Sequence, residues 1–425
     1  MKIDVAEFAK PCPCGHVHEI VVEDIFIESG AIRRLPGLIA QKGFKKPVVI
    51  CDENRGRVAG EAVMELLPES GLIVLDPTNL HANERAVAMV EEKLAKVGET
   101  DVMLAVGSGT VHDATRYVAH KIGVPFISVP TAASVDGFVS TVAAMTWHGC
   151  KQTFPAVAPI FVVADSDIFA KAPVRLNASG VSDLLGKYTA LADWKISHAV
   201  TGEYICDRVC QLEEEALAKV CACLPEIKEG KKEACEELMY ALLLSGLAMQ
   251  MVGNSRPASG AEHHMSHTWE MEMINGFVDF YHGEKVSVGL VLAARVYHKA
   301  AEKLRRGEYK IKPHMDVEMD FLKEHVKKPD MLEELTKENT PNPLDKVDAS
   351  VLAEKVPEIV KIIDQIPSEE EICRLIDQVG GVKSLTDIGL PESMLELTCK
   401  LSPYVRNRLT FMRLLKMFEI DGLFD

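Results

Sequence analysis

The chain has 425 residues, more than a single hydrophobic core usually accommodates, so we expect two domains. Its net charge of −16 argues against a nucleic-acid partner, because a phosphate backbone is bound by a basic surface. The N-terminus lacks the regions of a signal peptide and no uncharged apolar run is long enough to span a bilayer, so we expect a cytoplasmic protein without membrane insertion.

The first 168 residues alternate short apolar strands with amphipathic helices. Because each strand is too apolar to face water, we expect a mostly parallel sheet with helices on both faces. The expected strands span residues 46–51, 71–75, 101–106, 124–129 and 160–164, and the expected helices span residues 58–67, 84–97 and 110–122.

The pattern changes to helical periodicity in the second part of the chain. Residues 305–350 are charged and interrupted by prolines, which indicates an insertion of helices and loops. The predicted organisation is an α/β Rossmann-like nucleotide-binding domain at 1–168 and an all-α metal- and substrate-binding domain at 169–425. The expected helices span residues 183–200, 207–224, 231–252, 263–273, 284–304, 352–363, 368–379 and 403–417.

A glycine-rich turn joins the strand at 101–106 to the next helix. Gly107 and Gly109 leave backbone N–H groups free at a helix N-terminus, where a pyrophosphate can bind. The third glycine of the dinucleotide fingerprint is missing, so a plain strand-to-helix turn stays open. Asp52 ends an earlier strand and either accepts hydrogen bonds from a ribose or caps the following helix.

Three histidines within twenty residues suggest a metal site. His263 and His267 stand four residues apart on one predicted helix face, and His282 follows. Histidines without a metal are the alternative, but their number and spacing favour a ligand set, with Asp183 as a carboxylate partner. No cysteine is close in sequence, which favours an open catalytic site over a closed structural one. Asp183 could instead form a surface ion pair with Lys187, four residues on.

Two further loops carry candidate ligand contacts. Residues 130–140 follow the fourth strand with small and hydroxylated residues and a carboxylate, at the end of the sheet where α/β proteins bind ligands. Arg256 lies in the loop before the histidine helix and is either a local cation for a phosphate or a solvated arginine.

The segment Cys12–His18 holds two cysteines and two histidines within seven residues. It could bind zinc, but its spacing is tighter than that of usual structural zinc sites. A turn at Pro13 and Gly15 is the favoured interpretation. The eleven cysteines otherwise follow no small-scaffold pattern, so we expect reduced thiols.

Four segments resemble the sn-glycerol-1-phosphate dehydrogenases, above all their bacterial branch: residues 101–113, 130–137, 256–264 and 282–284. That family belongs to a superfamily with glycerol dehydrogenase, iron-containing alcohol dehydrogenase and dehydroquinate synthase. The resemblance runs from about Ile20 to about Tyr297 and implies a dehydroquinate synthase-like fold. It implies metal ligation by Asp183, His263 and His282, and substrate contacts from Asp136 and His267.

The resemblance also implies cofactor and substrate. NAD(H) or NADP(H) and one divalent metal (Zn²⁺, Ni²⁺ or Fe²⁺) would serve the interconversion of dihydroxyacetone phosphate and sn-glycerol 1-phosphate. Apart from the resemblance, we expect a homodimer and hypothesise that Arg256 or Lys187 holds the phosphate group. The implied cofactor contacts, with the turn already described, are Asp52, Gly107, Gly109, Thr110, Val111, His112, Asp113, Thr131, Ala132, Ala133, Ser134 and Ser140.

Other functions stay open. A glycerol or other polyol dehydrogenase of the same superfamily would lack a phosphate site. A metallohydrolase is disfavoured, because the motifs lack the carboxylates for a second metal. A non-catalytic nucleotide-binding protein stays open as a further alternative, which an assay for NADH turnover would decide. A dehydroquinate synthase is disfavoured because Ser259–His267 departs from the pattern of that enzyme.

Overall fold

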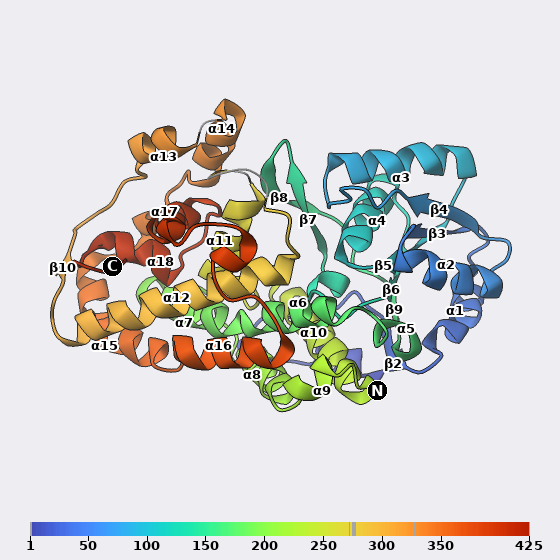
Figure 1. Ribbon diagram of the computed structural model, residues 1–425, viewed down its shortest axis with the longest axis horizontal. Coiled ribbons are helices and arrows are strands. Elements are labelled where there is room, and N and C mark those ends of the chain that lie inside the picture. The colour runs from blue at the N-terminus through green and yellow to red at the C-terminus, as the bar shows by residue number, and fades with distance from the viewer. Residues whose placement is uncertain (1, 272, 274–277, 327, 425) are drawn as a thin grey trace. The chain divides into compact units, whose positions relative to one another are not determined.

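A computed structural model describes residues 2–271, 273, 278–326 and 328–424 (Figure 1). The chain forms two compact units, of which the first comprises Met1–Trp147, Lys151–Leu184 and Gln211–Asn254. The second comprises His148–Cys150, Leu185–Cys210 and Ser255–Asp425. Because these units interleave along the chain, the expected domain boundary after residue 168 stays a prediction.

The first unit contains a sheet of seven strands. β1 pairs with β2 in the antiparallel sense, and all other neighbours are parallel, in the order β1-β2-β9-β6-β5-β3-β4. Every residue of β5, β6 and β9 is buried, which explains why these strands are apolar without alternation. The strands are β1 (Lys2–Ile3), β2 (Asp24–Glu28), β3 (Pro47–Asp52), β4 (Gly71–Leu75), β5 (Val102–Gly107), β6 (Phe126–Pro130) and β9 (Phe161–Asp165).

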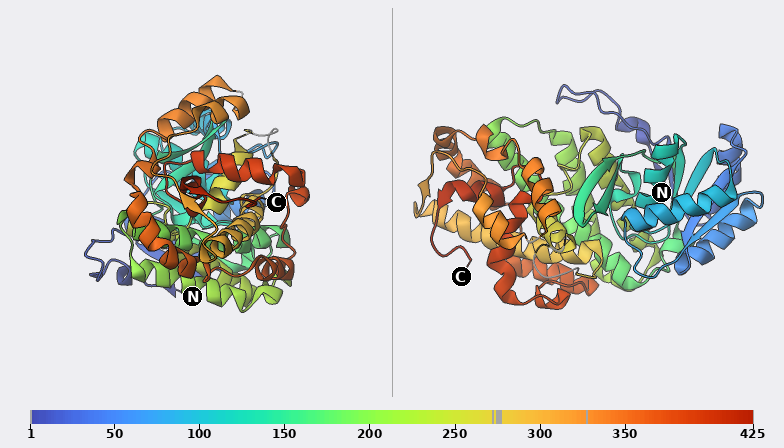
Figure 2. Two further views of the ribbon diagram at one scale, coloured as in Figure 1. Left: turned by 90° about the vertical axis from the view of Figure 1, so that its left-hand side faces the viewer. Right: turned by 90° about the horizontal axis from the view of Figure 1, so that it is seen from above.

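Helices cover both faces of this sheet (Figures 1 and 2). One face buries Val90 and Val118 of two helices against strand residues such as Ile50, and the other buries Leu35 and Val63. Successive strand residues contribute to opposite clusters, as the two-residue period of a strand requires. The helices of the first face are α3 (Glu84–Val97) and α4 (Gly109–Ile122), and those of the second are η2 (Ala31–Arg34), α1 (Leu35–Lys42) and α2 (Arg55–Leu66).

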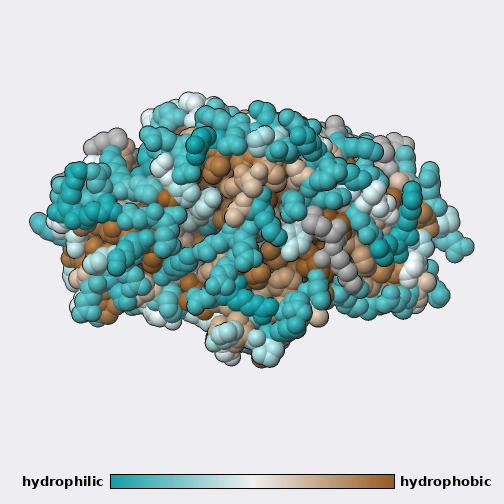
Figure 3. All heavy atoms as spheres, turned by 90° about the horizontal axis from the view of Figure 1, so that it is seen from below, coloured by the Kyte–Doolittle hydropathy of each residue, from teal (hydrophilic) through white to brown (hydrophobic). Residues whose placement is uncertain are grey.

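The first unit also contains the buried helix α10 (Lys232–Val252). By length and composition α10 could cross a membrane, but 72% of its most apolar window is buried, as in a core helix. Hydrophilic side chains cover most of the molecular face drawn in Figure 3. The other elements are η1 (Val5–Glu7), η3 (Gly137–Val139), β7 (Val142–Trp147), β8 (Cys150–Pro155), α5 (Ser166–Phe169), α6 (Val174–Leu185), α8 (Asp207–Cys221) and α9 (Leu224–Lys228).

The second unit is almost entirely helical. Its centre is formed by α7 (Lys187–Thr201), α11 (Ala261–Glu270) and α12 (His282–Arg305), which pack on one another and on later helices. The later elements are β10 (Lys310–Ile311), α13 (Met319–His325), α14 (Pro329–Glu338), η4 (Pro343–Lys346), α15 (Ala349–Ile363), α16 (Glu369–Val379), η5 (Thr386–Ile388), η6 (Glu392–Met394), α17 (Leu395–Leu401), η7 (Ser402–Tyr404), α18 (Phe411–Leu414), η8 (Leu415–Met417) and β11 (Phe418–Glu419).

The expected strands and the helices of the first 168 residues are confirmed within a few residues, whereas two later helices differ. The predicted helix at 183–200 is interrupted at Gly186, and Asp183 and Lys187 are fully buried, so the alternative of a surface ion pair is wrong. The predicted continuous helix at 403–417 is instead divided into helical segments at 402–404 and 411–417, which an irregular loop at 405–410 separates. There the side chain of Arg408 donates to the carbonyl of Ser259 at 2.6 Å and fixes the loop. Residue 272, in the predicted helix 263–273, lies outside the described residues.

Candidate metal centre and cofactor site

The carboxyl ends of three neighbouring parallel strands bring the predicted cofactor residues of the first unit together. β3 ends at Asp52, β5 at Gly107 and β6 at Pro130, and the register pairs Gly107 with Pro130. Thr131 donates its backbone N–H to the carbonyl of Gly107 at 3.0 Å, which connects the two loops. In open α/β sheets this edge is where ligands bind.

Helix α4 starts at this edge. The N–H groups of Gly109, Thr110 and Val111 lie in its first turn, where helix geometry provides no backbone acceptor. His112 has a different setting, because its Nδ1 lies 2.9 Å from the carbonyl of Ser108 and its Nε2 lies 2.8 Å from Oγ of Ser128. Burial lowers the pKa of His112 to about 3, so the ring is neutral and belongs to the packing beneath the turn.

The loop after β6 lies directly on α6. A Cβ atom on Gly180 would come within 2.0 Å of the carbonyl oxygen of Ala133, so only glycine permits this approach. Ser179 donates from Oγ to the carbonyl of Ser134 at 3.3 Å. Loop residues Thr131, Ala132, Ala133 and Ser134 are therefore positioned by α6, the helix that also carries Asp183.

Asp183 and Asp136 lie side by side in the first unit. The backbone N–H of Asp136 donates to Oδ2 of Asp183 at 3.0 Å, and Ser245 donates from Oγ to Oδ2 of Asp136 at 3.1 Å. Both carboxylates are buried, with Asp183 fully so, and a buried charge requires compensation. Ser140, at the end of η3, accepts the N–H of Val142 at 3.1 Å.

In the second unit the three predicted histidines lie together. The ring centroid of His282 lies 5.2 Å from that of His263 and 5.9 Å from that of His267, and the rings of His263 and His267 are 6.1 Å apart. A Cβ atom on Gly289 would lie 2.4 Å from the carbonyl oxygen of Glu262, so glycine lets α11 and α12 approach closely enough to gather these rings.

Two buried carboxylates fix the orientation of two of these rings. Nδ1 of His263 lies 2.7 Å from Oε1 of Glu262, and Nδ1 of His282 lies 3.0 Å from Oε1 of Glu270. A carboxylate acceptor places the hydrogen on Nδ1 and leaves the lone pair on Nε2, which is how metal-binding imidazoles are commonly oriented. The donor set therefore fits a divalent cation.

Glu262 is ionised although it is fully buried. Burial acts to raise its pKa, but the hydrogen bond and charge attraction of His263, with hydrogen bonds from Thr189 and Gly260, outweigh that effect and hold the pKa below its usual range. One ligand atom each of His267, Glu270 and His282 also lie within 4.8 Å of one another, so His267 stays close enough to serve this centre as ligand or as proton carrier.

Glu262 and Glu270 were missed as functional residues at the sequence level. The available signal was the adjacency of Glu262 to His263 and the position of both carboxylates on the helix that carries His263 and His267. Sequence patterns place a carboxylate near a ring, but only the packing of α11 on α12 shows which ring nitrogen it contacts.

The two predicted phosphate-binding cations are both buried. Arg256 forms a bidentate pair with Glu203, at 3.0 Å from Nε and 2.7 Å from Nη2, and it also donates to the carbonyl of Leu409 at 2.6 Å. It is therefore not a solvated loop arginine. Lys187 lies in the first turn of α7 and is fully buried.

The fold is that of the iron-containing alcohol dehydrogenase-like proteins. Residues 26–173 match the family model described as iron-containing alcohol dehydrogenase. Among solved structures, a putative alcohol dehydrogenase from Ralstonia eutropha superposes with a TM-score of 0.62 at 16% identity, covering 92% of this chain and 91% of that one. An iron-containing alcohol dehydrogenase from Corynebacterium glutamicum gives a TM-score of 0.60 at 18% identity, covering 94% and 95%.

The chain belongs to the glycerol-1-phosphate dehydrogenase family. The glycerol-1-phosphate dehydrogenase [NAD(P)+] of Halalkalibacterium halodurans is 34% identical over 413 residues, covering 95% of both chains. An enzyme of the same name from Pyrococcus horikoshii is 30% identical over 285 residues, covering 66% of this chain and 80% of the relative. This membership confirms the predicted resemblance, the fold class and an oxidoreductase, and agrees with the predicted nicotinamide cofactor and divalent metal.

Proposed function

We propose that this protein is a metal-dependent, NAD(P)-linked dehydrogenase that interconverts dihydroxyacetone phosphate and sn-glycerol 1-phosphate. The observation that carries the proposal is the pair of carboxylate-oriented imidazoles, Glu262 with His263 and Glu270 with His282. The relatives that match nearly the whole chain are named glycerol-1-phosphate dehydrogenase [NAD(P)+]. A small-molecule substrate fits this family, and the net charge of −16 makes a nucleic-acid partner unfavourable.

Asp183, His263 and His282 are the proposed metal ligands. One carboxylate and two imidazoles suit Zn²⁺, Ni²⁺ and Fe²⁺ alike. When bound, the metal supplies polarisation of the substrate oxygen and the nicotinamide supplies the acceptor or donor of the hydride. Glu262 and Glu270 keep the Nε2 lone pairs available by holding the hydrogen at Nδ1.

His267 and Asp136 are the proposed substrate contacts. His267 takes the proton from the substrate hydroxyl during oxidation and returns it to the substrate oxygen during reduction, as a histidine near the metal ligands can do. Asp136 orients a substrate hydroxyl, with its own carboxylate held by Ser245. The main contribution of His267 and Asp136 is then to position the reacting carbon of the substrate against the nicotinamide of the cofactor.

The cofactor is proposed to bind at the carboxyl edge of the sheet. The first-turn N–H groups of α4 receive the pyrophosphate, and the loop 131–134 and Ser140 line the cofactor. Asp52 accepts hydrogen bonds from the ribose, while one of its oxygens already accepts the N–H of Asn54 at 2.8 Å. His112 and Asp113, the remaining predicted cofactor contacts, follow these residues in the N-terminal part of α4.

Arg256 and Lys187 are the proposed partners of the substrate phosphate. Replacing either with Ala is expected to raise KM for dihydroxyacetone phosphate far more than for unphosphorylated dihydroxyacetone. Glu203→Gln serves as the control for Arg256→Ala, because it removes the charge of the bidentate partner while keeping the arginine. Equal increases in KM for both substrates would show that the cations do not bind phosphate.

The test of the proposed function is an NADH oxidation assay with dihydroxyacetone phosphate and chiral analysis of the product. Formation of sn-glycerol 1-phosphate supports the proposal. Faster turnover of glycerol than of glycerol 1-phosphate in the reverse direction would identify a polyol dehydrogenase instead. Tight NADH binding without turnover of any three-carbon polyol would identify a non-catalytic nucleotide-binding protein.

A cytoplasmic homodimer is the proposed state of the protein. No cysteine of the described residues forms a disulfide bond, which suits a reducing compartment. Sedimentation equilibrium measures the oligomeric state directly, and a mass equal to that of one chain would contradict the dimer.

A further inference from the structure

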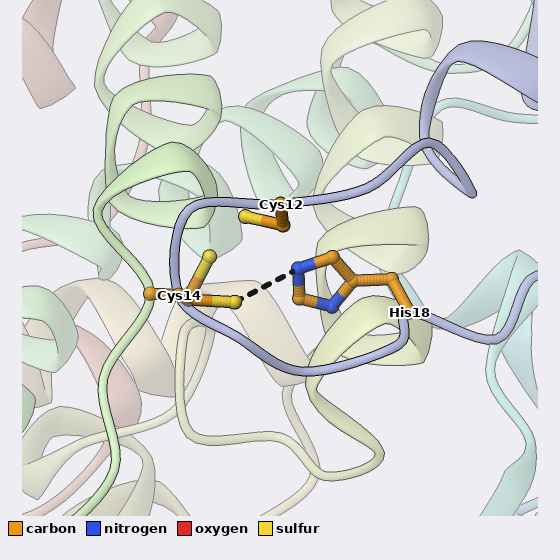
Figure 4. Close-up of side chains that lie close together, drawn as sticks. Cys12, Cys14 and His18 are labelled. Atoms are coloured by element: carbon orange, nitrogen blue, oxygen red, sulfur yellow. Dashed lines mark hydrogen bonds between the residues drawn. The ribbon is translucent and has the colours of Figure 1, made fainter.

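The segment before β2 brings three potential metal ligands to one point. Sγ of Cys12, Sγ of Cys14 and a ring nitrogen of His18 all lie within 4.8 Å of one another in the first unit. Figure 4 shows the three side chains pointing toward one another inside the loop that connects them. We propose that Cys12, Cys14 and His18 bind a Zn²⁺ ion that is separate from the catalytic metal.

The separation of the ligand atoms matches a zinc site. Sγ of Cys14 lies 3.5 Å from Nε2 of His18. Zinc binds sulfur at about 2.3 Å and nitrogen at about 2.0–2.1 Å, so two such ligands of a tetrahedral ion lie about 3.6 Å apart. The observed distance requires almost no movement to accept the ion.

The histidine is fixed in the tautomer that a metal needs. Nδ1 of His18 lies 2.6 Å from the carbonyl oxygen of Met251 in α10, and a carbonyl can only accept, so the hydrogen is on Nδ1. Nε2 therefore presents its lone pair toward Cys14. Backbone carbonyls play this orienting role behind many metal-bound imidazoles.

The surrounding contacts hold the loop in place. The N–H of Gly15 donates to the carbonyl of Cys12 at 3.1 Å, which closes the turn between the two cysteines. The side chain of Gln250, next to Met251, accepts the N–H of Val21 at 3.0 Å. His18 is only 2% exposed, whereas the preceding residue, Val17, is 88% exposed. The ring of His18 is therefore directed into the protein, although the side chain next to it faces solvent.

Zinc binding would convert both thiols to thiolates and release their two protons to solvent. Two thiolates and an imidazole supply three positions of a tetrahedral shell, and a water molecule or a further side chain fills the fourth. The ion would attach residues 12–18 to α10, with His18 as the connection. This favours a structural role for the site over the simple turn expected from the sequence.

Cobalt substitution tests the site in the full-length protein. Reduced, metal-free protein is titrated with Co²⁺, whose bonds to thiolate sulfur give an intense charge-transfer absorption in the near ultraviolet. The proposed catalytic ligands contain no sulfur, so this band reports the Cys12–His18 site alone. We expect the band in the wild type, its strong reduction in Cys12→Ser and Cys14→Ser, and its displacement by Zn²⁺.

Two control variants keep the experiment specific. Cys373→Ser removes a thiol of similar partial exposure elsewhere, and His16→Ala removes the other histidine of the loop, so both should retain the band. A thiolate band in the wild type without dehydrogenase activity would support this site and count only against the proposed function. Absence of the band from reduced wild type, or a Cys12–Cys14 disulfide that persists under reducing conditions, would overturn the proposal.

Discussion

The carboxylate of Glu262 contacts Nδ1 of the next residue, His263, at 2.7 Å. Gly260 donates its N–H to the same carboxylate at 2.7 Å, and Thr189 donates its hydroxyl to the other oxygen. The carboxylate is thus held from three sides, and it holds the imidazole in turn. The orientation of a proposed metal ligand therefore depends on residues of α7 and α11 as well as on the histidine itself.

Glu262→Gln is expected to weaken metal binding about 10- to 100-fold, because an amide orients and polarises the imidazole less well than a carboxylate. Competition with a chelating dye measures the metal dissociation constant. Glu284→Gln is the matched control, since Glu284 is also buried but accepts the N–H of Tyr281 instead of an imidazole. Equal metal affinity in Glu262→Gln and the wild type would contradict this role.

Gly180→Ala is expected to disturb the loop 131–134, because the new methyl group would lie 2.0 Å from the carbonyl oxygen of Ala133. Overpacking of this kind costs about 1–3 kcal/mol, and we expect weaker NADH binding. Fluorescence titration with NADH measures the effect. Gly137→Ala, where a Cβ atom meets no neighbour within 4 Å, should bind NADH as the wild type does. If both variants bind equally well, the loop does not contribute to the cofactor site.

Tyr297→Phe is expected to destabilise the second unit. The hydroxyl of Tyr297 donates to Oδ1 of Asp193 at 2.7 Å and accepts the N–H of Met412 at 3.1 Å, and both partners would lose a buried hydrogen bond. Such a loss costs about 1–3 kcal/mol in the free energy of unfolding, which urea denaturation measures. Tyr309→Phe, at a partly exposed ring, is the control. A stability loss confined to the control would refute this account.

His112 is expected to make stability depend on pH. Burial lowers its folded-state pKa to about 3, below the ordinary value of 6.5, so between these values only the unfolded state binds the proton. Stability should therefore fall as the pH falls through this window, by up to about 1.4 kcal/mol per pH unit from this group. Denaturation of metal-free protein at several pH values should show a smaller slope in His112→Asn. His120→Asn, at an exposed position of α4, should keep the wild-type slope, and an unchanged slope in His112→Asn would contradict the assignment.

The parallel sheet could be predicted from the sequence because its strands are short, apolar runs separated by amphipathic helices. The strand β2 and the hairpin of β7 and β8 were missed, since β7 and β8 form a separate two-stranded sheet and carry mixed polarity. The interruption at Gly186 was missed because helical periodicity continues across it. Long-range contacts decide such details, and a local pattern does not contain them.

The candidate site was likewise predictable only where a local sequence pattern carried the signal. Histidine spacing indicated a metal centre, and strand ends indicated the cofactor edge. The partners of the imidazoles depend on the approach of α11 to α12, and the bidentate contact of Arg256 with Glu203 joins residues 53 positions apart. The sequence therefore favoured a turn over a metal site at Cys12–His18, because the contact of His18 with Met251, 233 positions away, has no local signature.

The most direct test of the central claim is metal dependence of turnover. NADH oxidation with dihydroxyacetone phosphate is followed in fully chelated protein and again after addition of Zn²⁺, Ni²⁺ or Fe²⁺. We predict negligible turnover without metal and restoration by at least one of the three cations in the wild type, with no restoration in His263→Ala. Turnover that persists unchanged after exhaustive chelation would contradict a metal-dependent dehydrogenase.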